Sequence, residues 1–339
     1  MSVDRNFLKD HSFNMPSLKD LNGAILIDKP VGLSSFGVVH QVKKQLSQHF
    51  DCPMRRLPKV GHGGTLDPFA TGLLIVFIGK ASKLADYFLG SDKGYEGTIE
   101  FGIKTDSADI TGQLLESEKI DFTHWTEELV QRECDFFTHS PYFQTPPMFS
   151  AKKHQGKPLY RLARKGIEVP REPKQCHLRS FRVVSTCFPE IRFQLQCSSG
   201  TYVRTLAEDL AKRLNTLGVL KSLRRTHCGA KSLNQAISLE SLTEHLSHEE
   251  PINTLSSWVD FKDLLNHFKT IEVSRSEFFQ IKTMKDGPSP LLNRLVVNSQ
   301  TNDETKPPNF LALKHQHQLV GVLKNVNHEW SVHKTFGLR

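Results

Sequence analysis

The segment KVGHGGTLDPFATGLLIVFIG, residues 59–79, joins a glycine-rich loop to a continuous apolar run. The run GLLIVFIG, residues 72–79, has the length and composition of a strand that is buried on both faces of a sheet. The loop before it contains Gly61, Gly63 and Gly64 and, a few residues later, Asp67. Because glycine has no side chain and tolerates positive φ, such a loop lets a ligand approach the backbone closely. We therefore expect a buried strand that begins at a ligand-binding loop with Asp67 at its centre.

This loop does not match the known nucleotide-binding motifs. A P-loop requires G-x-x-x-x-G-K-[ST], whereas Gly79 and Lys80 are followed by Ala81, and no glycine lies five residues before Gly79. The clustered glycines do not fit the dinucleotide pattern G-x-G-x-x-G either, because Asp67-Pro68 interrupts the helix start that this motif needs. From the residues alone, Asp67 is either a turn or N-cap aspartate or a catalytic carboxylate.

Length and composition are typical of a globular protein with more than one domain. The chain has 339 residues, of which 38% are hydrophobic and 24% charged, and domains usually have about 100–200 residues. No apolar run approaches the roughly 18 residues that span a bilayer, and the N-terminus lacks the apolar core of a signal peptide. We expect a cytoplasmic protein with a flexible tail over residues 1–21, a main domain over 22–248 and a small β-rich domain over 249–339.

The cysteines do not indicate a metal site. Six cysteines are scattered along the chain, and none of them forms a C-x-x-C pair with another. A zinc site would need close pairs with His or Cys partners at ligand spacing. The sequence therefore predicts reduced cysteines, no metal and no cofactor.

The net charge of +8 is concentrated in two segments. Residues 149–175 and residues 211–231 each carry a surplus of six positive charges, so the remainder of the chain is slightly acidic. Concentrated basic charge favours a polyanionic partner, and it makes Lys152 and Arg225 candidate contacts to nucleic acid. The other interpretation is two ordinary solvated surfaces.

A second glycine-led segment, SSGTYVRTL at residues 198–206, leads into a predicted helix with leucines at a four-residue spacing. Tyr202 and Arg204 lie at the start of this helix. If Arg204 faces Asp67, opposite charges about 4 Å apart attract by roughly 4 kcal/mol at an effective dielectric near 20, before desolvation. That attraction would offset the effect of burial on the pKa of Asp67 and keep the carboxylate ionised. Alternatively, Arg204 binds a phosphate or a surface acid.

Six segments in the same order resemble the TruB family of pseudouridine synthases over roughly residues 22–230. They are GAILIDKPVGLSS (23–35), KVGHGGTLDPFATG (59–72), SDKGYEGTIEFGIKTDSADITG (91–112), PPMFSAKKHQGKPLYRLARKGIEVPR (146–171), CSSGTYVRTLAEDL (197–210) and SLRRT (222–226). One position departs from the family pattern, because Gly63 stands where many members have Thr.

The resemblance implies an α+β fold, with a mixed, mainly antiparallel central sheet flanked by helices and a small C-terminal β-rich domain of the PUA type. It implies that Asp67 is the nucleophile and that His62 contacts the RNA beside a flipped base. Tyr95 would stack on that base and is a candidate for removing the C5 proton. Tyr202 and Arg204 would line the pocket, with Arg204 paired to Asp67, and Leu223 would close its apolar side.

The reaction implied by this resemblance is the isomerisation of uridine 55 in the tRNA T-loop to pseudouridine, without cofactor or metal. The target atoms cannot be reached inside a folded loop, so the base must be flipped into a pocket. The sequence leaves open whether Asp67 attacks C1′ of the sugar or C6 of the base. The partner would be tRNA, bound by a monomer without an obligatory protein partner. The alternatives are a non-catalytic RNA-binding or tRNA-folding module and a guide-RNA-dependent relative that targets ribosomal RNA, which is less favoured because this sequence lacks the long Lys-rich extensions expected there.

Overall fold

The structure is a computed structural model that describes residues 17–18, 20–284, 290–299, 310–326 and 329–337. Most of the predicted N-terminal tail, residues 1–16 and 19, lies outside this part of the chain. Leu21, the last residue of the predicted tail, is buried with 2% of its surface exposed and belongs to the core. The boundaries of the tail and of the two expected domains stay predictions.

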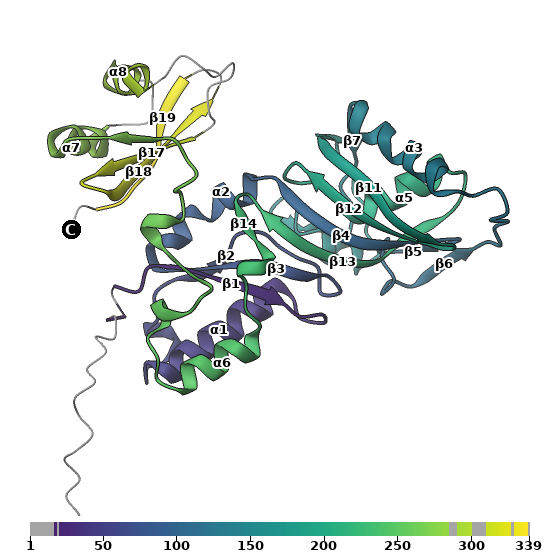
Figure 1. Ribbon diagram of the computed structural model, residues 1–339, viewed down its shortest axis with the longest axis horizontal. Helices are drawn as coiled ribbons and strands as arrows, with labels where there is room; N and C mark the ends of the chain where they lie inside the picture. The colour runs from purple at the N-terminus through teal and green to yellow at the C-terminus, as the bar shows by residue number, and fades with distance from the viewer. Residues whose placement is uncertain (1–16, 19, 285–289, 300–309, 327–328, 338–339) are drawn as a thin grey trace, which may run out of the picture.

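A nine-stranded sheet forms the centre of the molecule (Figure 1). Seven strands follow one another across it, and all neighbours are antiparallel except β13 and β3. This confirms the expected mixed, mainly antiparallel sheet. In spatial order the strands are β11 (Leu178–Cys187), β12 (Glu190–Cys197), β4 (Lys93–Phe101), β13 (Gly218–Cys228), β3 (Thr71–Ile78), β1 (Gly23–Lys29) and β15 (Trp258–Asp260), with β2 (Val60–His62) beside β3 and β14 (Lys231–Ser232) beside β13.

Strand β3 is buried on both faces, as its apolar run predicts. Leu74 and Val76 point to one face, where helices α1 (Ser35–His49) and α6 (Leu239–Ser247) lie side by side (Figure 1). Leu73 and Ile75 point to the other face, into a cluster shared with α2 (Ala85–Gly90) and the C-terminal part of the chain. Layers on both sides therefore hold β3, and with it the start of the glycine-rich loop, in a fixed position.

Strands β13 and β3 pair over two residues only, Arg224 with Thr71 and Arg225 with Gly72. Gly72 has a φ of 97°, and a Cβ atom there would lie 2.4 Å from the carbonyl oxygen of Arg225. Only glycine fits such a contact. The loop that carries Asp67 ends at this junction, so the close pairing of the two strands positions it.

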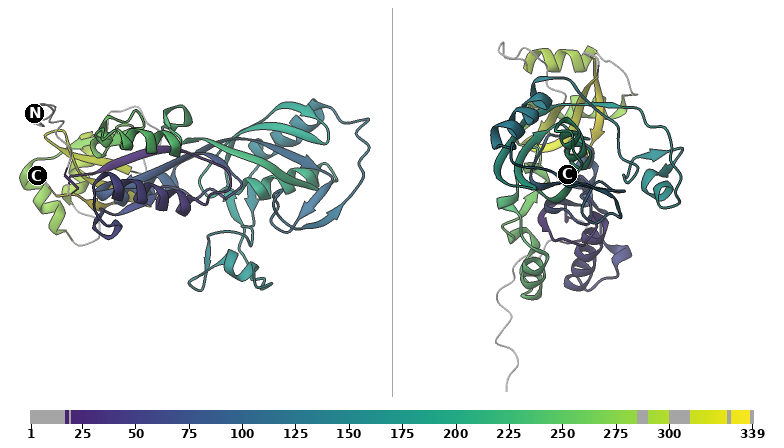
Figure 2. Two further views of the ribbon diagram at one scale, coloured as in Figure 1. Left: turned by 90° about the horizontal axis from the view of Figure 1, so that it is seen from below. Right: turned by 90° about the vertical axis from the view of Figure 1, so that its right-hand side faces the viewer.

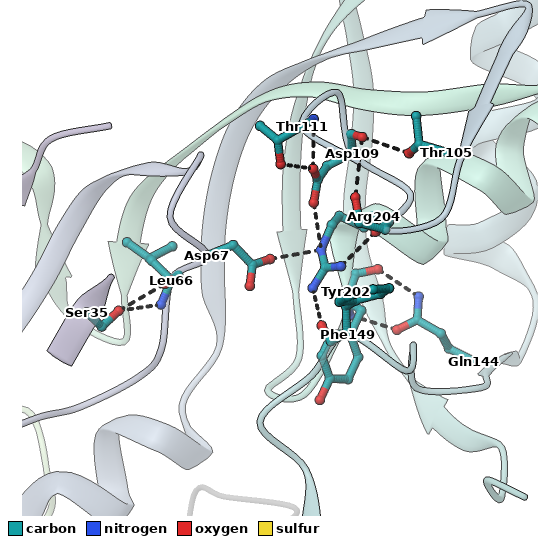
Figure 3. A network of polar contacts seen from close by, with 11 residues as sticks. Ser35, Leu66, Asp67, Thr105, Asp109, Thr111, Gln144, Phe149, Tyr202 and Arg204 are labelled. Carbon is teal, nitrogen blue, oxygen red and sulfur yellow. Dashed lines mark hydrogen bonds and ion pairs between the residues drawn. The ribbon is translucent and has the colours of Figure 1, made fainter. Parts of the chain in front are cut away.

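The other half of the sheet is covered on one face by helices α3 (Glu127–His139) and α5 (Val203–Arg213). The apolar side chains of α5, among them Leu206 and Leu210, are fully buried against this half of the sheet. The leucine spacing in the sequence indicated this packing. Figure 3 shows Tyr202 and Arg204, from the start of α5, beside Asp67.

The C-terminal part forms a separate four-stranded sheet, which confirms the expected β-rich region. Its strands are β16 (Thr270–Glu272), β17 (Phe310–His315), β18 (Gln318–Val326) and β19 (Glu329–Thr335). Two helices, α7 (Arg275–Thr283) and α8 (Pro290–Ser299), pack on it, and the expectation of a β-rich domain over 249–339 did not include them. The missed signal is the capping box of α7, in which Ser274 and Glu277 cap the helix reciprocally.

Residues 149–175, which we call the basic arm, form a projection that stands out from the body (Figure 2). The arm contains a short hairpin and one helix, namely β8 (Lys153–His154), β9 (Lys157–Pro158) and α4 (Leu159–Ala163). Its two ends are joined to the body by the pair β7 (Tyr142–Gln144) and β10 (Lys174–Cys176). A further hairpin, β5 (Ile103–Thr105) with β6 (Leu114–Ser117), extends beyond the end of β4.

Candidate active site

The loop that carries Asp67 is fixed on both sides of this residue. Before it, the Ser35 hydroxyl accepts a hydrogen bond from the Leu66 amide at 2.7 Å and donates one to the Leu66 carbonyl at 3.1 Å (Figure 3). After it, the carbonyl of Pro68 accepts hydrogen bonds from the amide of Gly32 and from the ammonium group of Lys29. The peptide units on each side of Asp67 therefore have external partners.

Lys29 is fully buried and has only carbonyl groups as hydrogen-bond partners in the described part of the chain. Its Nζ donates to the carbonyls of Pro30, Leu33 and Pro68 at 2.8, 2.6 and 3.3 Å. Burial lowers the pKa of Lys29 to about 8, although the negative charge of Asp67 opposes this shift. The ammonium group thus joins the chain after β1 to the Asp67 loop, which is a structural role.

Arg204 and Asp67 form an ion pair, as proposed from the sequence. The Nε atom of Arg204 lies 2.9 Å from Oδ2 of Asp67, and the guanidinium group is buried with 4% of its side chain exposed (Figure 3). The two remaining nitrogens of Arg204 each donate a hydrogen bond of 2.7 Å, one to the carbonyl of Ser107 and one to the carbonyl of Phe149. Each guanidinium nitrogen therefore has its own partner.

A second carboxylate lies behind Arg204. Oδ2 of Asp109 is 3.8 Å from the Nε atom of Arg204, and Oδ1 of Asp109 accepts hydrogen bonds from the amide and hydroxyl of Thr111. Asp109 is buried, with 4% of the residue exposed. Asp109 lies in segment 91–112, one of the six that resemble the family, but it was not among the predicted site residues. The signal that could have identified it is the pair of acidic residues Asp106 and Asp109 in a polar segment.

The pKa of Asp67 is raised above its ordinary value. Desolvation by burial is the largest cause, and the proximity of Asp109 adds to it, whereas Arg204 and Lys29 act in the opposite direction. The side chain of Asp67 nevertheless keeps 37% of its surface exposed, at the wall of a cavity. A carboxylate that is accessible, weakly solvated and held by a cation can act as a nucleophile.

The cavity beside Asp67 has a volume of about 290 Å³, which suits one small ligand. It brings together six of the residues singled out in the sequence, which are Asp67, Tyr95, Tyr202, Arg204, Leu223 and Arg225. His62 and Lys152 do not line it. A larger groove of about 610 Å³ also reaches Leu223 and is lined by residues of β4, β12 and β13.

Tyr95 lies on β4, directly opposite Arg225 of β13. Burial raises the pKa of Tyr95 to about 12, and the positive charge of Arg225 opposes this rise. The phenol is therefore protonated at neutral pH. Together with Leu223, it gives the cavity two apolar walls on neighbouring strands.

Arg225 is buried with 2% of the residue exposed, which corrects its assignment to an exposed basic surface. Its Nε donates to the carbonyl of Leu73 at 2.7 Å, and one terminal nitrogen donates to the carbonyl of Gly64 at 3.1 Å. The guanidinium group therefore links β3 to the glycine-rich loop. The sequence alone does not distinguish this buried arginine from a solvated one.

The other basic residues of segment 211–231 are largely neutralised within the protein. Arg224 pairs with Asp28, and Lys221 pairs with Glu100 and Glu190. Lys212 and Arg213 likewise pair with Asp209 and Glu133. Most charges of this segment are thus buried or paired within the protein, and RNA contact by the segment stays a prediction.

The basic arm, in contrast, presents its charges to solvent. Lys152, Lys153 and Lys157 are exposed, as are Arg161, Arg164, Lys165 and Lys174. Within the described residues, the one ion pair that the arm makes joins Arg171 to Glu168. The arm begins at Phe149, whose carbonyl contacts Arg204. The exposed basic charge of the chain therefore starts next to the cavity.

His62 lies on β2, before the glycine pair Gly63 and Gly64. Burial lowers the pKa of His62, so the ring is neutral at neutral pH. Its Nδ1 atom accepts a long hydrogen bond of 3.4 Å from the amide of Gly64. A Cβ atom at Gly63 would lie only 2.6 Å from the ring of Phe77, which explains why this chain has no larger residue there.

Comparison with known proteins places this chain in one class of enzyme, the pseudouridine synthases. A family model described as TruB family pseudouridylate synthase (N terminal domain) matches residues 53–203. The tRNA pseudouridine synthase B of Opitutus terrae is 42% identical over 224 residues, which are 66% of this chain and 88% of that protein. Its counterpart in Bordetella pertussis is 41% identical over 222 residues, again 66% of this chain and 87% of the relative. The chain belongs to the TruB family and is therefore an isomerase.

The fold also has a distant counterpart among solved structures. A chain of a Cbf5-Nop10-Gar1 complex superposes with a TM-score of 0.64 and 20% sequence identity. The match covers 89% of this chain and 78% of the other. At this identity the likeness concerns the fold alone.

Among the described residues, no helix is long and apolar enough to cross a membrane.

Proposed function

We propose that this protein converts uridine 55 in the T-loop of tRNA to pseudouridine, with Asp67 as the nucleophile. The observation that carries the proposal is the accessible Asp67 carboxylate, which lies at a cavity of single-base size and is paired at 2.9 Å with the buried Arg204. The names of the relatives support tRNA as the substrate.

The reaction rearranges bonds within one nucleotide. Asp67 forms a transient covalent bond to the nucleoside, and the bond between C1′ and N1 breaks. After the base rotates in the cavity, a bond between C1′ and C5 forms and Asp67 is released. A proton leaves C5 and a proton is gained at N1, so substrate and product are isomers and no net oxidant or reductant is needed.

We assign roles in this reaction to individual residues that line the cavity. Arg204 orients Asp67 and stabilises the charged carboxylate as it leaves the nucleoside. Tyr95 and Leu223 bind the flipped base between them, and a stacked aromatic contributes about 1–3 kcal/mol per base. Because a phenol with a pKa of about 12 accepts a proton poorly at neutral pH, we propose stacking rather than proton removal as the main role of Tyr95. Tyr202 lines the cavity beside Arg204.

The basic arm binds the phosphate backbone of the tRNA stem and loop. Its exposed lysines and arginines supply contacts that position an RNA without reading its sequence. His62 lies outside the cavity on β2, and we propose that it contacts the RNA at the rim as a neutral ring. A tRNA substrate also implies a cytoplasmic location. A monomer without an obligatory protein partner stays a prediction.

Mapping of pseudouridine in an unmodified tRNA after incubation with the protein tests this proposal. We expect pseudouridine at the T-loop uridine with the wild type and none with Asp67→Asn, which should still bind tRNA. Full activity of Asp67→Asn would overturn the nucleophile assignment. In a strain without its own synthase, rescue by Asp67→Ala as complete as by the wild type would favour a non-catalytic tRNA-folding role. A complex with RNA that contains 5-fluorouridine would identify the atom that Asp67 contacts.

A further inference from the structure

We infer that Gln144 is a positioning residue, which holds the first turn of α5 so that Arg204 meets Asp67. This inference rests on the proposed function of Asp67 and extends it to a residue that the sequence reasoning did not single out. Gln144 is 1% exposed and lies at the end of β7. It does not line the cavity, so it acts through other residues.

The side-chain amide of Gln144 makes hydrogen bonds to both backbone polar groups of Tyr202. Oε1 of Gln144 accepts a hydrogen bond of 2.7 Å from the Tyr202 amide, and Nε2 donates one of 2.9 Å to the Tyr202 carbonyl (Figure 3). Nε2 also donates to the hydroxyl of Tyr142 at 2.8 Å. A buried primary amide with these partners has one preferred orientation, because exchange of its oxygen and nitrogen would place like groups against each other.

Tyr202 is the N-cap residue of α5, and it lacks the side-chain hydrogen bond that usually caps a helix. Its carbonyl accepts the first hydrogen bond of the helix, from Leu206, as well as the one from Gln144. Arg204 follows two residues later. Gln144 therefore fixes the helix start from outside, at the turn whose arginine binds the nucleophile.

The chain that contains Gln144 contacts α5 at two further points. The hydroxyl of Tyr142 donates to Asp209, two turns along the helix, at 2.8 Å. Five residues after Gln144, the carbonyl of Phe149 accepts the hydrogen bond from Arg204, and the basic arm begins there. Segment 142–149 thus lies along α5, and Gln144 is its contact with the helix start.

A matched control exists on the neighbouring helix. Gln131 of α3 binds β11 in the same way, since its Nε2 donates to the Phe181 carbonyl at 3.0 Å and its Oε1 accepts from the Val183 amide at 2.8 Å. This amide also bridges two backbone groups, but its hydrogen bonds within the described residues go to Asp135, Phe181 and Val183 and not to α5, and it does not line the cavity. Loss of Gln131 and loss of Gln144 remove similar hydrogen bonds, and only the second reaches Arg204.

The experiment compares Gln144→Ala, Gln144→Glu and Gln131→Ala with the wild type. Because Arg204 lowers the pKa of Asp67, displacement of Arg204 should raise that pKa further. We expect Gln144→Ala to reduce kcat on unmodified tRNA by about 100-fold, as a small misplacement remote from the chemistry can do. The KM should stay near the wild-type value, and the acid limb of the kcat profile should move to higher pH. Gln131→Ala should leave kcat and the acid limb unchanged.

A carboxyl-carbon NMR titration of Asp67 in the free protein, assigned with Asp67→Asn, gives a readout that does not require activity. Gln144→Ala should raise the titration midpoint of Asp67, and Gln131→Ala should not. If the wild type forms no pseudouridine, the proposed function fails, and the titration still decides the inference. An unmoved midpoint in Gln144→Ala overturns it, as does a loss of activity that merely follows the fraction of unfolded protein.

If Gln144→Ala does not fold, the variant Gln144→Glu tests the inference instead. Its carboxylate keeps the acceptor for the Tyr202 amide but faces the Tyr202 carbonyl without a donor. Protonation restores one donor, so the activity of this variant relative to the wild type should rise as the pH falls. A ratio that does not change with pH overturns the inference.

Discussion

The guanidinium group of Arg204 holds Asp67 through one nitrogen and the carbonyls of Ser107 and Phe149 through the other two. Asp67 is thereby tied to two loops that lie far from it in the sequence. A planar group with donors in a fixed fork can make three such bonds at once, whereas an ammonium group is a point charge on a flexible chain. The shape of arginine matters here as well as its charge.

Arg204→Lys should therefore impair catalysis although it preserves the positive charge. We expect kcat to fall by about 100-fold, which is equivalent to about 2.7 kcal/mol of transition-state stabilisation. Single-turnover measurements with tRNA at saturating protein give this value directly. tRNA affinity, measured by filter binding, should not change, because Arg204 is buried. Wild-type kcat in Arg204→Lys would contradict a role for the fork geometry.

The raised pKa of Asp67 predicts opposite effects of pH on activity and on stability. The proposed nucleophilic role of Asp67 requires the ionised carboxylate, so we expect activity to be lost as the pH falls through a value above the ordinary 3.8. The folded protein binds this proton more tightly than the unfolded chain, so ionisation of Asp67 costs stability at neutral pH. Asp67→Asn should therefore have a higher Tm than the wild type at neutral pH, and the difference should shrink as the pH falls. A lower Tm of Asp67→Asn at neutral pH would argue against this explanation.

Arg225→Glu should unfold the protein rather than weaken RNA binding selectively. The substitution leaves a buried negative charge against the carbonyls of Leu73 and Gly64, and an uncompensated buried charge costs about 3–5 kcal/mol. Urea denaturation measures the loss. Lys152→Glu is the comparison, since this exposed lysine should leave the free energy of unfolding unchanged and reduce tRNA affinity.

Affinity for tRNA should depend steeply on salt, and the basic arm should supply most of this dependence. Each phosphate that is neutralised contributes about 0.7–0.9 to the slope of log K against log salt concentration. Replacement of Lys152, Lys153 and Lys157 by glutamine should lower both the affinity and the slope. Lys221→Gln is the control, because Lys221 is already paired with Glu100 and Glu190. An equal loss in the control would show that the arm is not the main RNA-binding surface.

Gly63→Thr should destabilise this chain, although threonine is the residue that the family resemblance leads us to expect at this position. A Cβ atom would lie 2.6 Å from the Phe77 ring and 3.1 Å from Cβ of Phe88. Overpacking of this kind costs about 1–3 kcal/mol. Urea denaturation of Gly63→Thr measures the loss, and the added substitution Phe77→Leu should recover part of it. An unchanged stability of Gly63→Thr would show that Phe77 moves freely.

Local sequence was sufficient to predict the elements whose burial follows a simple apolar pattern. The run 72–79 predicts a doubly buried strand because each of its residues is apolar, and the leucines of α5 predict its packed face because their spacing follows the helix period. The loop around Asp67 could be recognised because glycines and an Asp-Pro step restrict the backbone locally. The position of α7 was missed, since its helical signal lies in the capping residues Ser274 and Glu277 rather than in an apolar pattern.

Interactions between distant segments depended on the tertiary structure. Asp67 and Arg204 are 137 positions apart, so their pairing was expected from the family resemblance and not from a local pattern, and the structure confirms the contact. Charge in the sequence does not reveal whether an arginine is solvated, as on the arm, or buried against carbonyls, as Arg225 is. The two hydrogen bonds from Gln144 to Tyr202 could not be predicted from the sequence either, because the partners of a glutamine side chain depend on which backbone groups the fold brings next to it. The residue types thus indicated the chemistry, and the packing of remote segments selected the residues that can perform it.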